Sequence, residues 1–437
     1  MKKGFFSALF SLTLFLVSCS PTMTSPTIPP PTPSPSPAPA AGITVWLDGT
    51  RLAGARAYQK LYPEKAALID FKEVDRGQFP AQILKFNQQG KGWPDVVFAE
   101  PDLVAQVADA EHDFALDLKP VIPAEVLNNF EACAHDPCTF NGELLCLRHD
   151  TSPMVLYYNK PLMDQFGYAV PATWQEYQAI GERLAAEHPG YIIGSFGDAW
   201  GFKAYFDASG CPSSWVLGEK SVHINFADER CVRAAKLVDT LLANGTLAPY
   251  SYFDGKFTRI AQEDKLLMLV GPAWMAIYSF GGKPGSQYYT TSNGQLGVAG
   301  PLKWDGDDRL YTSAMGGAGW VISKHTQNLP LALDFAVWMV RAPEFWANPA
   351  SGFISPDYPV YLPVQPAWQE TVRALPLFAN DPFPAMQKGS LAISPLFTLP
   401  NYDVMRLCVH PQALSETGRR NTAAPINAST GSPRSLR

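Results

Sequence analysis

Short apolar runs alternate with helical patterns just after the first forty residues, and this alternation restricts the fold more than any other feature. Residues 43–48, 67–74 and 94–98 are apolar runs typical of buried strands, and segments of helical spacing at 52–61 and 79–87 separate them. The order strand, helix, strand, helix, strand is typical of a parallel sheet with helices on both faces. The sequence therefore predicts an α/β fold.

The length of the chain indicates more than one core. About 395 residues follow position 42, which exceeds what a single hydrophobic core usually organises, so we expect two lobes. Local signals predict a hairpin around Asn141-Gly142, a helix that begins with a capping box at 173–176, and helices at 229–243 and 331–340.

The amino terminus has the features of an export signal. Lys2 and Lys3 precede an apolar run at 5–17 that is short for a membrane span. The run ends in Leu-Val-Ser-Cys, which resembles the lipobox of bacterial lipoproteins. This resemblance implies a signal peptide at 1–19 and lipidation of Cys19. The alternative is an ordinary secretory signal in which the cysteine is incidental.

The segment at 20–42 contains nine prolines and no charged residue. Such a composition cannot bury a core and is typical of an extended, semi-rigid tether. A tether after an acylated cysteine would let a globular body stand away from the membrane. We therefore expect the folded part of the protein to lie outside the cytoplasm.

The remaining cysteines indicate disulfides. They are Cys133, Cys138, Cys146, Cys211, Cys231 and Cys408. An even number in an exported chain favours bridges, although many connectivities are open. We expect Cys211 to pair with Cys231, one bridge within 133–146, and Cys408 in the third. A zinc site that includes His135 is the alternative, but the cysteines do not repeat as two close pairs.

Composition excludes some function classes. The net charge is −6 and 17% of the residues are charged, so no basic surface for nucleic acid is indicated. Aromatic residues make up 12%, and 11 of them are tryptophan. Aromatic rings provide stacking surfaces for sugars and other apolar faces, although a large α/β core also contains many of them.

Six stretches, taken together and in this order, resemble the family 1 extracellular solute-binding proteins of ABC importers, the maltose-binding-protein-like group. The stretches are residues 43–48, 93–102, 140–144 with 149–160, 171–176, 265–274, and 297–301 with 316–325. Pro94-Asp95-Val96 is similar to the family's third strand, and Gly271-Pro272-Ala273-Trp274 to its Gly-Pro-Trp turn. Residues 145–148 depart from the family's Tyr-Gly-Leu-Pro.

The resemblance implies a two-lobed periplasmic-binding-protein-like fold of type II, with discontinuous lobes and a ligand cleft between them. The first lobe is expected at 43–151 and 308–352, and the second at 152–307 and 353–415. Hinges are expected near 150–151, 309–310 and 353–354, and a loose tail at 416–437.

The candidate site residues follow strands, because open α/β sheets bind ligands outside the carboxyl ends of their strands. Asp48 and Arg51 follow the first strand, Glu100 and Asp102 the third. The resemblance implies ligand contacts at Asp48, Arg51, Glu100, Asp150, Trp200, Trp274, Gly316 and Gly317. Tyr358 and Trp368 are further candidates, whereas we expect Trp46, Trp338 and Trp346 to serve packing.

The resemblance implies that the protein captures a small solute, a carbohydrate in the first place, by hinge closure. It would deliver the solute to the membrane subunits of an ABC permease. We expect a monomer, lipid-anchored on the outside of the cell membrane, with no cofactor, no metal and no catalysis.

Two alternatives stay open. The same fold would serve a polyamine, a phosphate ester or ferric ion, the last through Tyr157-Tyr158 or Tyr288-Tyr289. A secreted glycan hydrolase is the other alternative, but the sequence has no Gly-x-Ser-x-Gly elbow.

Overall fold

The computed structural model describes part of the chain, all of it within one compact unit, Ala41–Arg437. The described residues are 41–108, 111–132, 134–212, 215–218, 221–223, 225–281, 289, 292–348, 353–393 and 426–427. The predicted signal peptide with Cys19, residues 20–40 of the predicted tether, Cys133, Tyr288 and Cys408 lie outside them. Among these residues, no helix is both long and apolar enough to cross a membrane.

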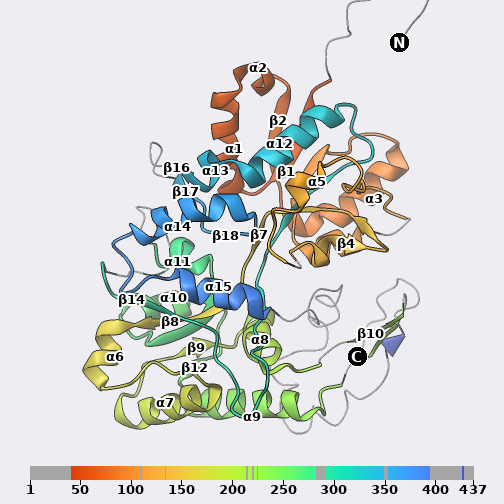
Figure 1. Cartoon of the computed structure of the whole chain (residues 1–437). Helices are drawn as coiled ribbons and strands as arrows, with labels where there is room; N and C mark the ends of the chain where they lie inside the picture. Colours follow the sequence, from red (N-terminus) through yellow and green to blue (C-terminus); the bar gives the residue numbers. More distant parts are fainter. Residues whose placement is uncertain are drawn as a thin grey trace, which may run out of the picture. The chain divides into compact units, whose positions relative to one another are not determined.

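The first lobe is built on a five-stranded sheet of order β2-β1-β3-β15-β6. Figure 1 labels its strands β1 and β2. The strands are β1 (Ile43–Leu47), β2 (Ile69–Glu73), β3 (Val96–Ala99), β6 (Leu147–Arg148) and β15 (Gly319–Ile322). Strand β1 pairs in parallel with β2 and β3, as predicted. Strand β15 returns from a distant part of the sequence and pairs antiparallel with β3 and β6.

Helices cover both faces of this sheet. They are α1 (Gly49–Leu61), α3 (Phe79–Gln89) and α12 (Leu329–Arg341). Successive strand residues point to opposite faces. Phe71 of β2 contacts Phe335 of α12, while Trp46 of the neighbouring β1 contacts Phe86 of α3 from the other face. Tyr58 of α1 packs edge-on against Phe335, so α1 and α12 share one face.

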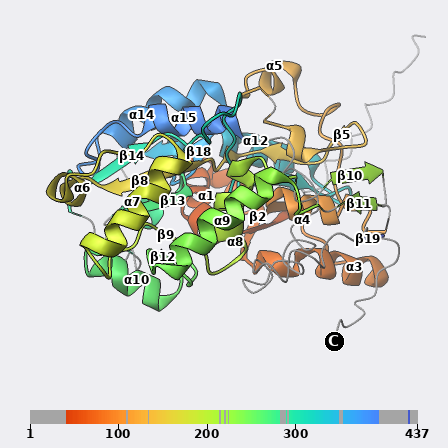
Figure 2. The same ribbon diagram turned by 90° about the horizontal axis from the view of Figure 1, so that it is seen from below.

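The second lobe has a three-stranded antiparallel sheet, β13-β8-β14, with β8 (Met154–Asn159) in the centre. Its other strands are β13 (Met268–Pro272) and β14 (Leu296–Ala299), with a small parallel pair β9 (Gly194–Ser195) and β12 (Leu247–Ala248). The helices are α6 (Lys160–Phe166), α7 (Trp174–Glu187), α8 (Ala199–Phe206), α9 (Glu229–Ala243), α10 (Gly255–Gln262), α11 (Met275–Tyr278) and α15 (Phe383–Ala392). Helices α7 and α9 lie side by side (Figure 2).

Several local predictions are confirmed. The capping box at the start of α7 is formed by Thr173 and Glu176, and α9 has the predicted bounds. Asn141 and Gly142 both have positive φ and join β4 (Thr139–Phe140) to β5 (Glu143–Leu144). Cys211 forms the predicted disulfide with Cys231. A second disulfide joins Cys138 to Cys146 within the predicted cluster.

The remaining elements are short. They are α2 (Pro63–Ala66), α4 (Pro101–Gln106), α5 (Ala124–Leu127), β7 (Asp150–Thr151), β10 (Trp215–Gly218), β11 (Ser221–His223), α13 (Pro343–Trp346), β16 (Ala347–Asn348), β17 (Phe353–Ile354), β18 (Tyr358–Pro359), α14 (Gln365–Arg373) and β19 (Ile426–Asn427), with 3-10 turns at Arg76–Gln78, Asp136–Cys138, Asp207–Ser209 and Leu362–Val364. Strand β19, in the predicted tail, pairs with β11.

The chain passes between the two sheets through adjacent segments. Strand β7, which leads from β6 to β8, pairs with β18, and Pro153 bridges to Ala314 on the segment from β14 to β15. Helix α14 packs against α13, whereas α15 packs against β8. The predicted lobe limits stay predictions, and this packing favours a third crossing after α14 rather than at 353–354.

Candidate functional site

The eight predicted ligand residues all line one cavity of about 590 Å³. Its described lining comes from both lobes and from the crossing segments between them. The full set is Asp48, Gly49, Thr50, Arg51, Glu73, Glu100, Asp150, Ser152, Trp200, Phe253, Trp274, Tyr278, Met315, Gly316, Gly317, Ala318, Pro356 and Asp357. Sequence positions more than 300 residues apart therefore meet at one place.

The first-lobe wall lies at the carboxyl ends of three parallel strands. Asp48 follows β1, Glu73 ends β2 and Glu100 follows β3. Asp48 is the N-cap of α1, and its side chain accepts a hydrogen bond of 3.0 Å from the backbone N–H of Arg51. A capping aspartate satisfies an otherwise unpaired helix N–H. The cap therefore fixes both the start of α1 and the position of Arg51.

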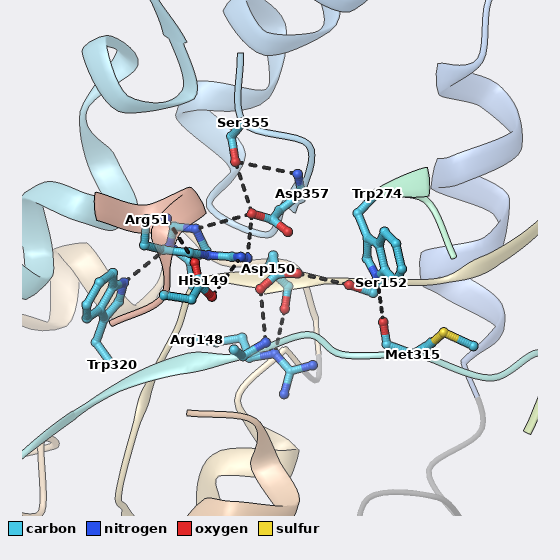
Figure 3. Close-up of polar contacts among 12 residues, drawn as sticks. Arg51, Arg148, His149, Asp150, Ser152, Trp274, Met315, Trp320, Ser355 and Asp357 are labelled. Atoms are coloured by element: carbon cyan, nitrogen blue, oxygen red, sulfur yellow. Dashed lines mark hydrogen bonds and ion pairs between the residues drawn. The ribbon is translucent and has the colours of Figure 1, made fainter. Parts of the chain in front are cut away.

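Arg51 is the centre of a largely buried ion-pair group. Its guanidinium lies 2.6 Å from Asp357 (Figure 3). It also lies 3.2 Å from Asp48 and 4.4 Å above the centre of the Phe98 ring. Burial lowers the pKa of Arg51, but attraction by Asp357 and Asp48 outweighs it and raises the pKa overall. Arg51 stays charged and its terminal nitrogens are engaged by carboxylates.

Asp357 is a lining residue that the sequence analysis missed. It follows β17 in a Ser-Pro-Asp turn, where Ser355 Oγ lies 3.1 Å from the Asp357 carboxylate. Burial raises its pKa, against the opposing effect of Arg51. The signal available in the sequence was this turn motif, but only the crossing of the chain brings it to Arg51.

Asp150 lies at the junction of the crossing segments. It is fully buried, and its carboxylate accepts hydrogen bonds from Ala318 N at 2.9 Å and Ser152 Oγ at 3.0 Å. Its strand pairs with Pro359 of β18. Burial and the nearby Asp357 raise the pKa of Asp150 to about 7, although Arg51 and Arg148 oppose the shift. Asp150 therefore connects three segments that are distant in sequence.

His149 is not placed to act as a base. It is fully buried, is stacked on Trp346, and its Nδ1 accepts a hydrogen bond of 3.2 Å from Trp320 Nε1. Burial, followed by the charges of Arg51 and Arg148, holds its pKa well below the usual range. The neutral ring with its Nε2 3.9 Å from Asp357 supports the packing behind the cavity.

The second-lobe wall is aromatic. Trp200 follows β9, Phe253 follows β12 and Trp274 follows β13. The carboxyl ends of these strands point the same way, because β9 is parallel to β12 and Ile192, just before β9, bridges in parallel to Leu266, just before β13. Trp274 is held by a 2.9 Å hydrogen bond from its Nε1 to Met315 O. This wall therefore meets the crossing segment at Met315.

Two aromatic residues in this wall were missed. Phe253 lies nearly parallel to Trp274, with ring centroids 6.1 Å apart and planes 7° apart. Tyr278 is four residues after Trp274 on one helical turn and lies edge-on to it at 83°. The helical spacing was a usable signal for Tyr278, whereas the two-residue β12 before Phe253 was too short to recognise.

Gly316 and Gly317 form part of the cavity lining with φ values of 90° and 84°. A side chain at Gly317 would place its Cβ 2.4 Å from Arg148 Nη2. Arg148 is buried beneath this loop, where burial lowers its pKa to about 10. The left-handed backbone at Gly317 therefore favours glycine, and an added Cβ would also force the end of the Arg148 side chain to move.

Other predicted aromatic residues lie outside the cavity. Tyr358 and Trp368 are buried, and they donate hydrogen bonds to Glu131 and to Ser355 O. These two candidates therefore serve packing. Trp46 and Trp346 are buried, as expected. Within the described part of the chain, no group of three or more His, Cys, Asp or Glu could hold a metal ion.

The chain resembles known proteins in sequence and in fold. The family model described as bacterial extracellular solute-binding protein matches residues 68–375. A protein of Deinococcus radiodurans, named as a probable ABC transporter-binding protein, is 25% identical over 309 residues, which are 67% of this chain and 68% of that protein.

Solved structures share the two-lobed fold. The cyclic alpha-maltosyl-1,6-maltose binding protein of Arthrobacter globiformis is 19% identical with a TM-score of 0.66, covering 88% of this chain and 96% of that one. The galacto-N-biose/lacto-N-biose I-binding protein of Bifidobacterium longum is 18% identical with a TM-score of 0.65, covering 87% and 92%. Because the family model spans well over half of the chain, the protein belongs to the bacterial extracellular solute-binding proteins.

Proposed function

We propose that the protein captures a carbohydrate, a mono- or oligosaccharide, for an ABC importer. The observation that carries this proposal is the pairing of an aromatic wall with a wall of carboxylates, an arginine and glycine amides in one cavity. Carboxylates and amides bond sugar hydroxyls in fixed directions, and aromatic rings cover the apolar face of a pyranose. The cavity volume of about 590 Å³ lies in the usual range for small-molecule sites.

Capture would proceed by hinge closure. Lining residues belong to both lobes, so a bound solute contacts both and favours the closed arrangement. We place the hinge at the crossing segments around Asp150. The predicted lobes, at 43–151 with 308–352 and at 152–307 with 353–415, are part of this proposal, with residues 353–373 moved to the first lobe because α14 packs against α13.

The proposed setting is the outer side of the cell membrane. Cys19 would carry the lipid anchor and residues 20–42 the tether, and the closed monomer would dock on the permease subunits. No bond would be broken, a role supported by the matched family, which is one of solute-binding proteins. The Deinococcus relative's name supports the ABC transporter part of the proposal.

A non-sugar solute is the second candidate, and the excess of carboxylates in the lining favours a polyamine among such solutes. A ferric site at Tyr157-Tyr158 has little support, because Tyr157 is buried and donates to Pro272 O at 2.8 Å within the sheet. A phosphate ester would need a cation, yet Arg51 is already paired with two carboxylates.

A thermal-shift screen of the purified protein over saccharides, polyamines, phosphate esters and ferric ion tests the proposal. We expect at least one saccharide to raise the melting temperature, because a ligand that binds only the folded state stabilises it. A rise with a non-sugar alone would contradict the carbohydrate assignment. Incubation of the same saccharides, followed by product analysis, would detect hydrolysis if the protein were an enzyme.

A further inference from the structure

The lining of the cavity is strongly acidic. Among the described lining residues, five carboxyl groups accompany one guanidinium; they belong to Asp48, Glu73, Glu100, Asp357 and Asp150, the last with its pKa raised to about 7. The guanidinium of Arg51 is engaged by two of them, at 3.2 and 2.6 Å. An anionic ligand would therefore meet like charges, and such juxtaposition is strongly disfavoured in a binding site.

Glu73 is an exposed carboxylate of the lining that lies outside the ion pairs of Arg51. It ends β2 and its side chain lies beside Gly49, where an added Cβ would stand 2.9 Å from Glu73 Oε1. In the part of the chain that the structure describes, no lysine, arginine or histidine forms an ion pair with it. Its charge is therefore available to a ligand at the edge of the cavity.

The opposite wall also favours positive charge. The faces of Trp and Phe rings carry negative electrostatic potential, so they attract cations as well as apolar C–H groups. Phe253 and Trp274 present nearly parallel rings, and Tyr278 stands edge-on beside them. Acidic and aromatic walls that face one ligand are a combination suited to an ammonium group on an otherwise neutral, apolar-faced molecule.

We propose that the ligands are saccharides that carry a protonated amino group, and that Glu73 determines this specificity. The inference rests on the proposed carbohydrate function and narrows its substrate class. Neutral saccharides would bind more weakly through the same hydroxyl contacts, and uronic acids or sugar phosphates would be rejected.

Calorimetric titration of the purified full-length protein with matched ligands tests the inference. The panel holds hexoses and disaccharides that differ at one position, as hydroxyl, amino or acetamido, together with uronic acids and spermidine. At low salt we expect the amino member to bind at least about tenfold more tightly than its hydroxyl counterpart. The advantage should shrink at about 0.5 M salt, because screening shortens the reach of the carboxylates.

The variant Glu73→Gln should lose most of the amino preference, and Glu125→Gln is the matched control. Glu125 is exposed on α5 outside the lining, so its substitution makes the same change in net charge. We expect the ratio of amino to hydroxyl affinity to fall several-fold in the first variant only. An equal fall in both would mean that net charge alone is responsible and would overturn the role of Glu73.

The remaining outcomes distinguish a failure of the amino specificity from a failure of carbohydrate capture. Equal or tighter binding of the hydroxyl, acetamido or uronic members overturns the amino specificity and leaves carbohydrate capture intact. Binding of spermidine alone, or of no member of the panel, contradicts carbohydrate capture itself.

Discussion

The two walls of the cavity differ in how much of their chemistry is already bonded within the protein. In the first-lobe wall, Arg51, whose side chain is 11% exposed, forms an ion pair of 2.6 Å with the buried Asp357. In the second-lobe wall, Phe253 and Tyr278 leave 42% and 40% of their surface exposed. The first wall is therefore part of the folded core, whereas the second keeps ring surface that a ligand can cover. Substitutions in the first-lobe wall should mainly lower the stability of the fold, whereas substitutions in the second-lobe wall should mainly lower the affinity for the ligand.

Removal of the Arg51 charge should have the largest effect. Arg51→Met leaves Asp48 and Asp357 without their shared partner in a buried site, which typically costs about 3–5 kcal/mol. Urea denaturation followed by tryptophan fluorescence measures the loss. Lys324→Met is the control, because its ion pair with Asp113 at 2.7 Å is exposed and should contribute about 1 kcal/mol or less. Equal losses of unfolding free energy in the two variants would contradict the claim that the first-lobe wall is part of the folded core.

Gly317→Ala should come next, at about 2–3 kcal/mol. The substitution combines the cost of positive φ, about 1–2 kcal/mol for a residue with a Cβ, with contact at 2.4 Å to Arg148. Gly245→Ala isolates the first part, since Gly245 has φ of 80° and nothing within 4 Å of an added Cβ. If both variants lose the same free energy of unfolding, the contact with Arg148 adds no cost, and Arg148 does not support the loop at Gly316 and Gly317.

Asp150 should make stability depend on pH. Its pKa is raised to about 7 in the folded protein from 3.8, so between these values the folded state binds the proton more tightly than the unfolded chain. Its contribution therefore falls as pH rises through this window, by at most about 1.4 kcal/mol per pH unit. Denaturation across the window should show wild type losing stability relative to Asp150→Asn as pH rises. Parallel profiles would argue against the raised pKa.

Phe253→Ala should have the smallest effect on stability, about 1 kcal/mol or less, because 42% of the residue is exposed to solvent. Phe257→Ala is the matched control, four residues later on α10, where the ring is fully buried and its loss should cost about 3–5 kcal/mol. Only the first variant should weaken ligand binding at unchanged stability. A large loss in Phe253→Ala would show that the aromatic wall is also part of the core.

The predictable parts of the site follow local rules. Asp48 caps a helix directly after a strand, and Glu100 follows the next strand along the sheet, so strand order was enough to bring them together. The same rule holds for Trp274, which follows β13. The parallel core of the first lobe was predictable because its short strand-like runs alternate with segments of helical spacing.

The missed parts depend on contacts between distant segments. Asp357 reaches Arg51 because β18 pairs with β7, a pairing of two residues that no local pattern marks. Tyr358 and Trp368 lie in the core for a similar reason, because they contact segments that are distant in sequence or brought close only by the fold. Phe253 follows a strand of two residues, too short to produce an alternating pattern.

Titration of a saccharide identified by the screen into wild type and Trp274→Ala tests the central claim most directly. We expect saturable binding by wild type, affinity at least about tenfold weaker in Trp274→Ala, and similar melting temperatures without ligand. Trp93→Ala, which removes an indole outside the cavity, should keep wild-type affinity. Undiminished binding by Trp274→Ala, or an equal loss in Trp93→Ala, would contradict the assignment of this cavity as the site of capture.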